Sequence, residues 1–187
     1  MRFLRLFSAS MASLFMLLGL TLSAVQAQAE EIKWERIAGT TVFGDVVGVG
    51  TDQVAGAAPW TTTDGMAKVD LASGKVKFKV RGLVLAVGSA PADSLFGLGI
   101  GTPSGVTEVK GTLVCNVDGT NTVKGQSVVV DTDEVALDAQ GDAQFNGTFS
   151  IPAVCSSAPE DTAFLIRIVE PAGFFNLYIA FGAVRVP

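Results

Sequence analysis

The chain has 187 residues and no histidine, which excludes several kinds of site at once. Without an imidazole it cannot build a Ser-His-Asp or Cys-His catalytic device, or a zinc or haem site that uses histidine ligands. Aromatic residues other than phenylalanine are scarce, with 2 Trp and 1 Tyr. Apolar residues make up 49% and charged residues 17%, which is too hydrophobic for an intrinsically disordered protein. The composition indicates a folded protein without histidine chemistry.

The first 29 residues have the layout of a secretory signal peptide. Arg2 and Arg5 give a positive start, an apolar run follows over 11–22, and Ala27-Gln28-Ala29 is a small-x-small cleavage site. The apolar run holds 12 residues, whereas a membrane-spanning helix needs roughly 20. We therefore expect cleavage near Ala29 and a secreted protein, extracellular or periplasmic, with no transmembrane helix in the mature chain.

The mature chain, residues 30–187, is expected to form a single acidic domain. It keeps 11 basic and 18 acidic residues, a net charge of −7. Such a surface is a poor partner for nucleic acid, because phosphate neutralisation needs clustered basic residues. The expected partner is an unidentified protein or a polysaccharide. The high apolar fraction also allows a homo-oligomer that buries one sheet face.

Cys115 and Cys155 are the two cysteines of the chain. In an oxidising compartment such a pair most simply forms one structural disulfide. The alternative is two buried free thiols. A redox role is disfavoured because the sequence has no Cys-x-x-Cys motif.

The clearest predicted strand is 75–81, where side chains alternate strictly. Lys75, Lys77, Lys79 and Arg81 take one face, and Val76, Phe78 and Val80 take the other. We expect a hairpin between this strand and 66–71, with a glycine at position 74 supplying the positive φ of the loop. Further strands are expected at 32–37, 42–49, 106–117, 126–131, 134–139, 143–151, 163–169 and 174–186.

The pattern predicts an all-β fold of about 8–10 strands, since no helices alternate with the strands. An antiparallel β-sandwich fits best, and a small β-barrel is the alternative. Residues 50–65 and 88–105 are read as long loops because Gly, Ala, Pro, Ser and Thr dominate them. An outer-membrane β-barrel is a further alternative, but only three Trp or Tyr residues are present for its aromatic girdles.

The basic strand face, Lys75, Lys77, Lys79 and Arg81, is the first candidate site. It gathers four of the eleven mature basic residues on an acidic chain. It could dock an anionic ligand such as an acidic polysaccharide. The alternative is a solvated face opposed by carboxylates of the neighbouring strand, with Asp70 among them.

The second candidate is the acidic segment Asp131-Thr132-Asp133-Glu134. Exported β-proteins bind Ca²⁺ through carboxylate-rich loops, because hard cations take oxygen ligands. Asp131, Asp133 and Glu134 would be the ligands. The spacing is not that of an EF-hand, and an acidic hairpin turn is the alternative interpretation.

No catalytic residue or organic cofactor is predicted. The Gly-rich segment 97–103 lacks the following helix of a dinucleotide loop, since Pro103 and Gly105 oppose one. A small carbohydrate-active enzyme could still use paired carboxylates without histidine. Trp60, expected in a loop and exposed, would be its sugar platform. The leading interpretation is a non-catalytic module with a binding or structural role in the cell envelope or extracellular space.

Residues 74–84 carry a Gly-Lys-Val-x-Phe-x-Val-x-Gly-Leu-Val pattern. It resembles strand segments of the chordin-type (CHRD) secreted β-domains. The His-containing motif of that family has no counterpart in this chain, so the resemblance implies a β-strand and transfers no function.

Overall fold

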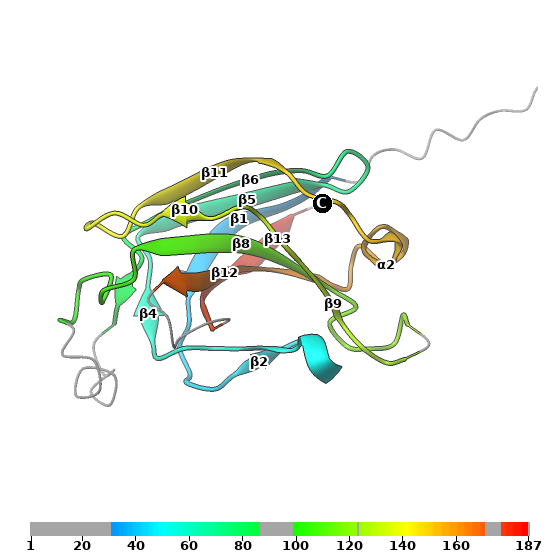
Figure 1. The fold of residues 1–187 in the computed structure, drawn as a ribbon, viewed down its shortest axis with the longest axis horizontal. Coiled ribbons are helices and arrows are strands. Elements are labelled where there is room, and N and C mark those ends of the chain that lie inside the picture. Colours follow the sequence, from blue (N-terminus) through cyan, green and yellow to red (C-terminus); the bar gives the residue numbers. More distant parts are fainter. Residues whose placement is uncertain (1–30, 87–98, 123, 171–176, 187) are drawn as a thin grey trace, which may run out of the picture.

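The computed structural model describes residues 31–86, 99–122, 124–170 and 177–186, and these are almost entirely β-structure (Figure 1). The predicted all-β class is confirmed. The predicted signal peptide and most of the predicted 88–105 loop lie outside the described residues. Among the residues described, no helix is both long enough and apolar enough to cross a membrane.

Thirteen strands and two short helical turns are described. The longer strands are β1 (Glu31–Gly39), β5 (Asp64–Asp70), β6 (Lys75–Arg81), β8 (Glu108–Cys115), β9 (Val128–Asp131), β11 (Ala143–Thr148), β12 (Thr162–Glu170) and β13 (Tyr178–Val186). Five strands have two residues each: β2 (Val46–Val47), β3 (Val54–Ala55), β4 (Trp60–Thr61), β7 (Val84–Leu85) and β10 (Val135–Ala136). The helical turns are η1 (Gly50–Asp52) and α2 (Ala153–Ser157).

Nine strands form one antiparallel sheet that curls into a half-barrel. Its order is β10-β8-β12-β13-β1-β5-β6-β11, with β9 also paired to β8. The strands β10 and β11, at the two ends of this path, contact each other, and the turn 137–142 connects them. In Figure 1 the two lie side by side above β8. The curl therefore brings the two edges of the sheet together at this turn.

The β5–β6 hairpin follows the predicted pattern closely. Gly74 has φ +70°, and its N–H donates to the carbonyl of Asp70 at 2.8 Å. The Asp70 carboxylate orders the same loop by accepting hydrogen bonds from the Ala72 and Ser73 N–H groups and from the Ser73 hydroxyl. A position with this left-handed backbone conformation favours glycine, because glycine has no Cβ atom to clash with the backbone.

The concave side of the sheet holds the main core. Phe164 lies between Trp34 and Phe78, with ring centroids 5.6 and 5.8 Å apart. Gly111 on β8 provides the space, since a Cβ there would approach the Phe78 and Phe164 rings to 2.8 Å. Such burial of large aromatic surface is the main stabilising term of a domain of this size.

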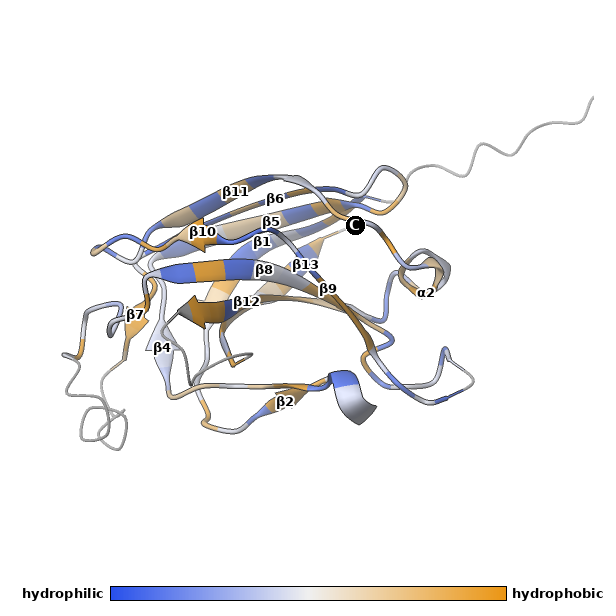
Figure 2. Cartoon of the chain, in the orientation of Figure 1, coloured by the Kyte–Doolittle hydropathy of each residue, from blue (hydrophilic) through white to orange (hydrophobic). Residues whose placement is uncertain are grey.

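A second apolar layer covers the convex side of β8, β12 and β13. There Val54 of β3 packs with Val114, Leu165 and Tyr178. Both faces of β12 are consequently buried, which explains why its central residues are continuously apolar instead of alternating. Figure 2 shows the contrast with β8, where hydrophilic and hydrophobic residues alternate at its start.

Several predicted strand boundaries are wrong, because pairing with distant strands, rather than the local sequence pattern, determines where the observed strands begin and end. Of the predicted strand 42–49 only β2 is regular, and of 134–139 only β10. The predicted loop 50–65 contains β3 and β4, which form two-stranded ribbons with β2 and β7. The helix α2 has only five residues, so the sequence shows no periodic hydrophobic pattern that would predict it.

The predicted disulfide between Cys115 and Cys155 is present. The sulfur atoms are 2.08 Å apart and the Cα atoms 5.0 Å apart, and both residues are fully buried. Because Cys115 ends β8 and Cys155 lies in α2, the bond ties the segment after β11 to the end of β8. A disulfide is compatible with an exported protein, because such bonds persist in oxidising compartments.

Candidate ligand-binding face

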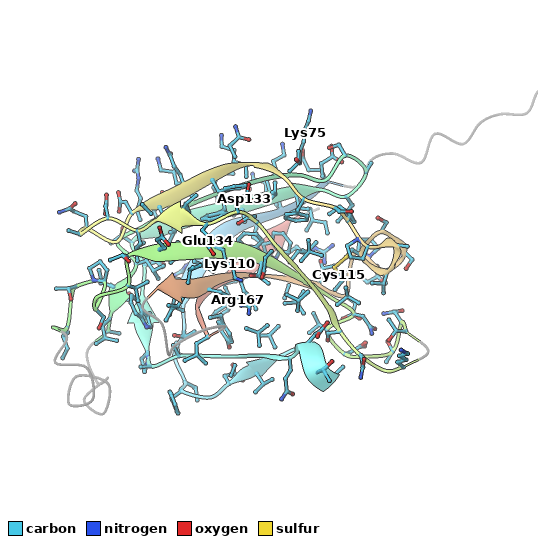
Figure 3. All side chains as sticks on the ribbon, in the orientation of Figure 1. Lys75, Lys110, Cys115, Asp133, Glu134 and Arg167 are labelled. Carbon is cyan, nitrogen blue, oxygen red and sulfur yellow. A yellow bond between two sulfur atoms is a disulfide. The ribbon has the colours of Figure 1, made fainter. Side chains whose placement is uncertain are left out.

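The four basic residues of β6 project from the convex side of the half-barrel. Their strand alternates between outward and buried positions, with Val76, Phe78 and Val80 fully buried. Figure 3 shows the labelled Lys75 projecting away from the sheet. We call Lys75, Lys77, Lys79 and Arg81 the basic strip. Alternate residues of a strand lie about 6.8 Å apart, so the strip is roughly 20 Å long.

On the β5 side, the residues opposite the strip are only partly acidic. Arg81 faces Asp64, and the charge of Lys75 contributes to lowering the pKa of Asp70, after the hydrogen bonds from Ser73 and Ala72. At the centre, however, Lys77 faces Lys68. The expectation of opposing carboxylates therefore holds at the two ends of the strip and is wrong at its centre.

On the β11 side, the opposite residues are neutral and hydrogen-bonding. Lys75, Lys77 and Lys79 face Thr148, Asn146 and Gln144 respectively, and these three polar residues are exposed. Each cross-strand pair thus places an ammonium group beside an amide or a hydroxyl group. The combined surface offers both positive charge and neutral hydrogen-bonding groups.

The nearby lysines are ion-paired, unlike those of the strip. Lys68 pairs with Glu31 at 2.6 Å, and Lys33 pairs with Glu35 at 2.9 Å. In the part of the chain that the structure describes, no residue of the basic strip has a carboxylate oxygen within 4.0 Å. These four cations are therefore available to an external anion.

A groove of about 550 Å³ lies where the strip meets the turn between β10 and β11. Lys79 and Arg81 line the groove and also belong to the basic strip. Two carboxylates and an amide, those of Asp138, Asp142 and Gln144, line it as well, and the remaining lining includes Val80, Val135, Ala136 and Ala143. The sequence did not reveal this groove, because it depends on how β11 pairs with β6 and on where the turn 137–142 places β10.

The acidic segment that was a candidate calcium site is arranged differently. Asp131 accepts from Thr112 at 2.6 Å and forms ion pairs with Lys110 at 2.7 Å and Arg167 at 3.0 Å. Burial raises the pKa of this carboxyl, but the hydrogen bonds from Lys110 and Thr112 and the charge of Arg167 outweigh it and lower the pKa. Lys110 and Arg167 are cross-strand neighbours on β8 and β12 (Figure 3).

These contacts form an ion-pair cluster around Asp131, the first of the three predicted calcium ligands. Asp131 already binds two side-chain cations, while Asp133 and Glu134 are exposed. Among the described residues, no group of three or more Asp, Glu, Cys or His side chains is placed to hold a metal ion. The cluster explains why a charged residue, Arg167, can be 95% buried within β12.

Trp60 also differs from its prediction. It is 5% exposed, belongs to β4 and pairs with Leu85 of β7, as part of the main core. It is therefore unavailable as a sugar platform. The condition that would have favoured a carboxylate-based glycosidase, an exposed Trp60 beside two carboxylates, is not met.

Comparison of this chain with protein-family models, curated proteins and solved structures found no significant match. The functional argument therefore rests on the geometry of the molecule.

Proposed function

We propose that this protein is an exported, non-catalytic binding domain whose basic strip docks a linear anionic polymer. The observation that carries the proposal is the centre of the strip. There Lys77 has Lys68 and Asn146 as its cross-strand neighbours, and Lys79 has Met66 and Gln144. No carboxylate faces either lysine from the adjacent strands.

This arrangement has an energetic cost for the folded protein. Like charges directly opposite each other in a sheet destabilise it, whereas opposite charges stabilise it. Glu31 already neutralises Lys68, so Lys77 is the member of this pair whose charge an external anion would neutralise. A polymer fits this surface better than a small anion, because the cations form a row of roughly 20 Å instead of converging on one point.

The scaffold suits such a surface. The strip lies on β6, which is hydrogen-bonded to β5 on one side and to β11 on the other, and the side chains between its members are buried in the core. The strand backbone therefore fixes the spacing of the cations. On the expected mature chain, residues 30–187 with a net charge of −7, their positive potential is local and would guide an anionic polymer to this face.

A binding experiment with residues 30–187 tests the proposal. The probes are polygalacturonate, dextran sulfate and neutral dextran, measured by isothermal titration calorimetry at low and at 0.5 M salt. We expect both anionic polymers to bind, neutral dextran not to bind, and added salt to weaken binding through screening.

The variant Lys77→Gln/Lys79→Gln should weaken binding of the anionic polymers at least tenfold. The matched control is Arg36→Gln/Lys124→Gln, which removes the same charge at exposed positions that are not part of the strip. Equal losses in both variants, or no binding of either anionic polymer to the unmodified protein, would overturn the proposal.

A further inference from the structure

We infer that the groove at the Arg81 end of the basic strip is a subsite for one uronic-acid unit, a sugar residue with a carboxylate and free hydroxyl groups. This inference rests on the proposed function and specifies the chemistry of the polymer. Lys79 and Arg81 line the groove and are also the last two members of the strip. A chain bound along the strip would therefore run directly into the groove.

The two carboxylates of the groove are held in place by backbone groups. The Oδ1 atom of Asp138 accepts from the N–H groups of Gln140 and Asp142, at 2.9 and 2.8 Å. The Oδ1 atom of Asp142 accepts from the N–H group of Gly82 at 2.9 Å. Within the described residues, the Oδ2 atom of each carboxylate accepts no hydrogen bond. Two oriented acceptors thus remain for a ligand.

The cationic, acceptor and apolar groups that line the groove favour some anionic ligands over others. Lys79 and Arg81 can bind a carboxylate, and a guanidinium group does so in a bidentate way. The Oδ2 atoms of Asp138 and Asp142 need hydrogen-bond donors, which sugar hydroxyls provide. Gln144 can donate and accept, and Val135 and Ala136 give an apolar wall for the C–H groups of a sugar ring.

Other polyanions fit this groove less well. Polyphosphate has no hydroxyl groups along its chain, so its oxygens would meet the carboxylates of Asp138 and Asp142 with like charge. A heavily sulfated polysaccharide has lost most of its hydroxyl donors and meets the same repulsion. A uronate polymer keeps both the anion and the hydroxyl groups on each unit.

The test compares polygalacturonate, dextran sulfate and polyphosphate on the unmodified protein and on Asp138→Asn/Asp142→Asn. Asparagine keeps the Oδ1 acceptor of each turn but replaces the second oxygen with a donor, so the turns are preserved. We expect polygalacturonate to bind at least fivefold more weakly to this variant, although two negative charges have been removed. Polyphosphate and dextran sulfate should bind it equally well or more tightly.

Two further variants separate the subsite from general electrostatics. Asp133→Asn/Glu134→Gln removes the same charge at exposed positions outside the groove and should not weaken polygalacturonate binding. Gln144→Leu, on the exposed side of β11, should weaken polygalacturonate selectively without disturbing a turn.

The outcomes also distinguish the subsite from the proposed function. In one outcome, Lys77→Gln/Lys79→Gln no longer binds polygalacturonate, whereas Asp138→Asn/Asp142→Asn binds it as well as or better than the unmodified protein. This outcome would contradict the subsite and support the proposed binding to the basic strip. If dextran sulfate binds as tightly as polygalacturonate at equal charge, the subsite is also wrong. If no anionic polymer binds the unmodified protein, both proposals fail.

Discussion

Lys77 on β6 lies directly opposite Lys68 on β5, so two positive side chains face each other on the convex side of the sheet. Lys68 has a partner in Glu31, whereas Lys77 has no carboxylate within ion-pair distance among the described residues. The relationship links stability to the proposed function, because the charge of Lys77 that disfavours folding beside Lys68 would also attract an anionic ligand.

Replacing Lys77 with glutamate should stabilise the protein and impair binding. Lys77→Glu converts a like-charge pair into an opposite-charge pair, which is worth about 0.2–1 kcal/mol in the free energy of unfolding. Urea unfolding measures this gain, and calorimetry with polygalacturonate measures the loss of affinity. The control is Lys75→Glu, next to Asp70, which should not stabilise. An unfolding free energy that falls in Lys77→Glu would contradict the like-charge interpretation.

The sequence predicted the basic strip well, because strict alternation over 75–81 determines which side chains share a face. It could not predict what lies opposite them, because cross-strand neighbours depend on register. The hairpin loop at Gly74 sets Lys68 against Lys77. The groove was harder still to predict, since it depends on the pairing of β11 with β6 and on the position of β10 beside β11.

Trp60 and Asp131 show a second reason why a local sequence pattern is an incomplete guide to the structure. A Pro-Trp-Thr segment between small residues resembles a loop, yet β4 is pulled into the core by pairing with β7. Three carboxylates in four residues resemble a cation site, yet Lys110 and Arg167, distant in sequence, take Asp131. In both cases a long-range partner overrode the local pattern.

The ion-pair cluster predicts a specific pH dependence. Because the folded pKa of Asp131 is lowered, its contribution to stability is present above the unfolded pKa near 3.9 and is lost as the pH falls through the folded value. Asp131→Asn should lower the free energy of unfolding by about 1–3 kcal/mol at pH 7, allowing for partial exposure of the carboxylate. The difference from the unmodified protein should shrink below about pH 4.

The control for this measurement is Asp133→Asn, an exposed neighbour, which should change stability by less than about 0.5 kcal/mol. Urea unfolding at several pH values, with Ca²⁺ or EDTA present, measures both the pH dependence of stability and any stabilisation by Ca²⁺. Stabilisation by Ca²⁺ that disappears in Asp131→Asn would restore the calcium interpretation and reject the cluster.

The buried disulfide should contribute strongly to stability. Its sequence separation is 40 residues, for which the chain-entropy relation gives about 4 kcal/mol. Unfolding with and without a reductant measures the difference. Because both cysteines are fully buried, reduction of the native protein should be much slower than reduction in denaturant. Equal reduction rates in the two conditions would show that the bond is accessible.

Two glycines with the same backbone conformation should tolerate alanine differently. Gly74 has φ +70° and Gly44 has φ +76°, so each substitution incurs about 1–2 kcal/mol of conformational strain. A Cβ at Gly44 meets nothing within 4 Å, whereas one at Gly74 collides with the carbonyl oxygen of Phe149. Gly74→Ala should therefore cost at least about 1 kcal/mol more than Gly44→Ala in urea unfolding. Equal costs would mean that β11 can move away from the hairpin.

The single tyrosine makes one pKa directly observable. Burial, the nearby charge of Asp45 and the hydrogen bond to its carboxylate, 3.3 Å from the hydroxyl, together raise the pKa of Tyr178 to about 12. Since the folded pKa exceeds the unfolded value near 10, the stabilising contribution is present below pH 10 and is lost between about pH 10 and 12.

Ultraviolet titration of the phenolate should therefore show little ionisation at pH 10 while the protein remains folded, and a midpoint near 10 in urea. Asp45→Asn removes one of the three causes and should lower the folded midpoint without exposing the ring. Tyr178→Phe should reduce the loss of stability between pH 10 and 12, because the other alkaline groups are unchanged. A folded midpoint near 10 would mean that Tyr178 is in contact with water, and that β3 does not cover β8, β12 and β13 in solution.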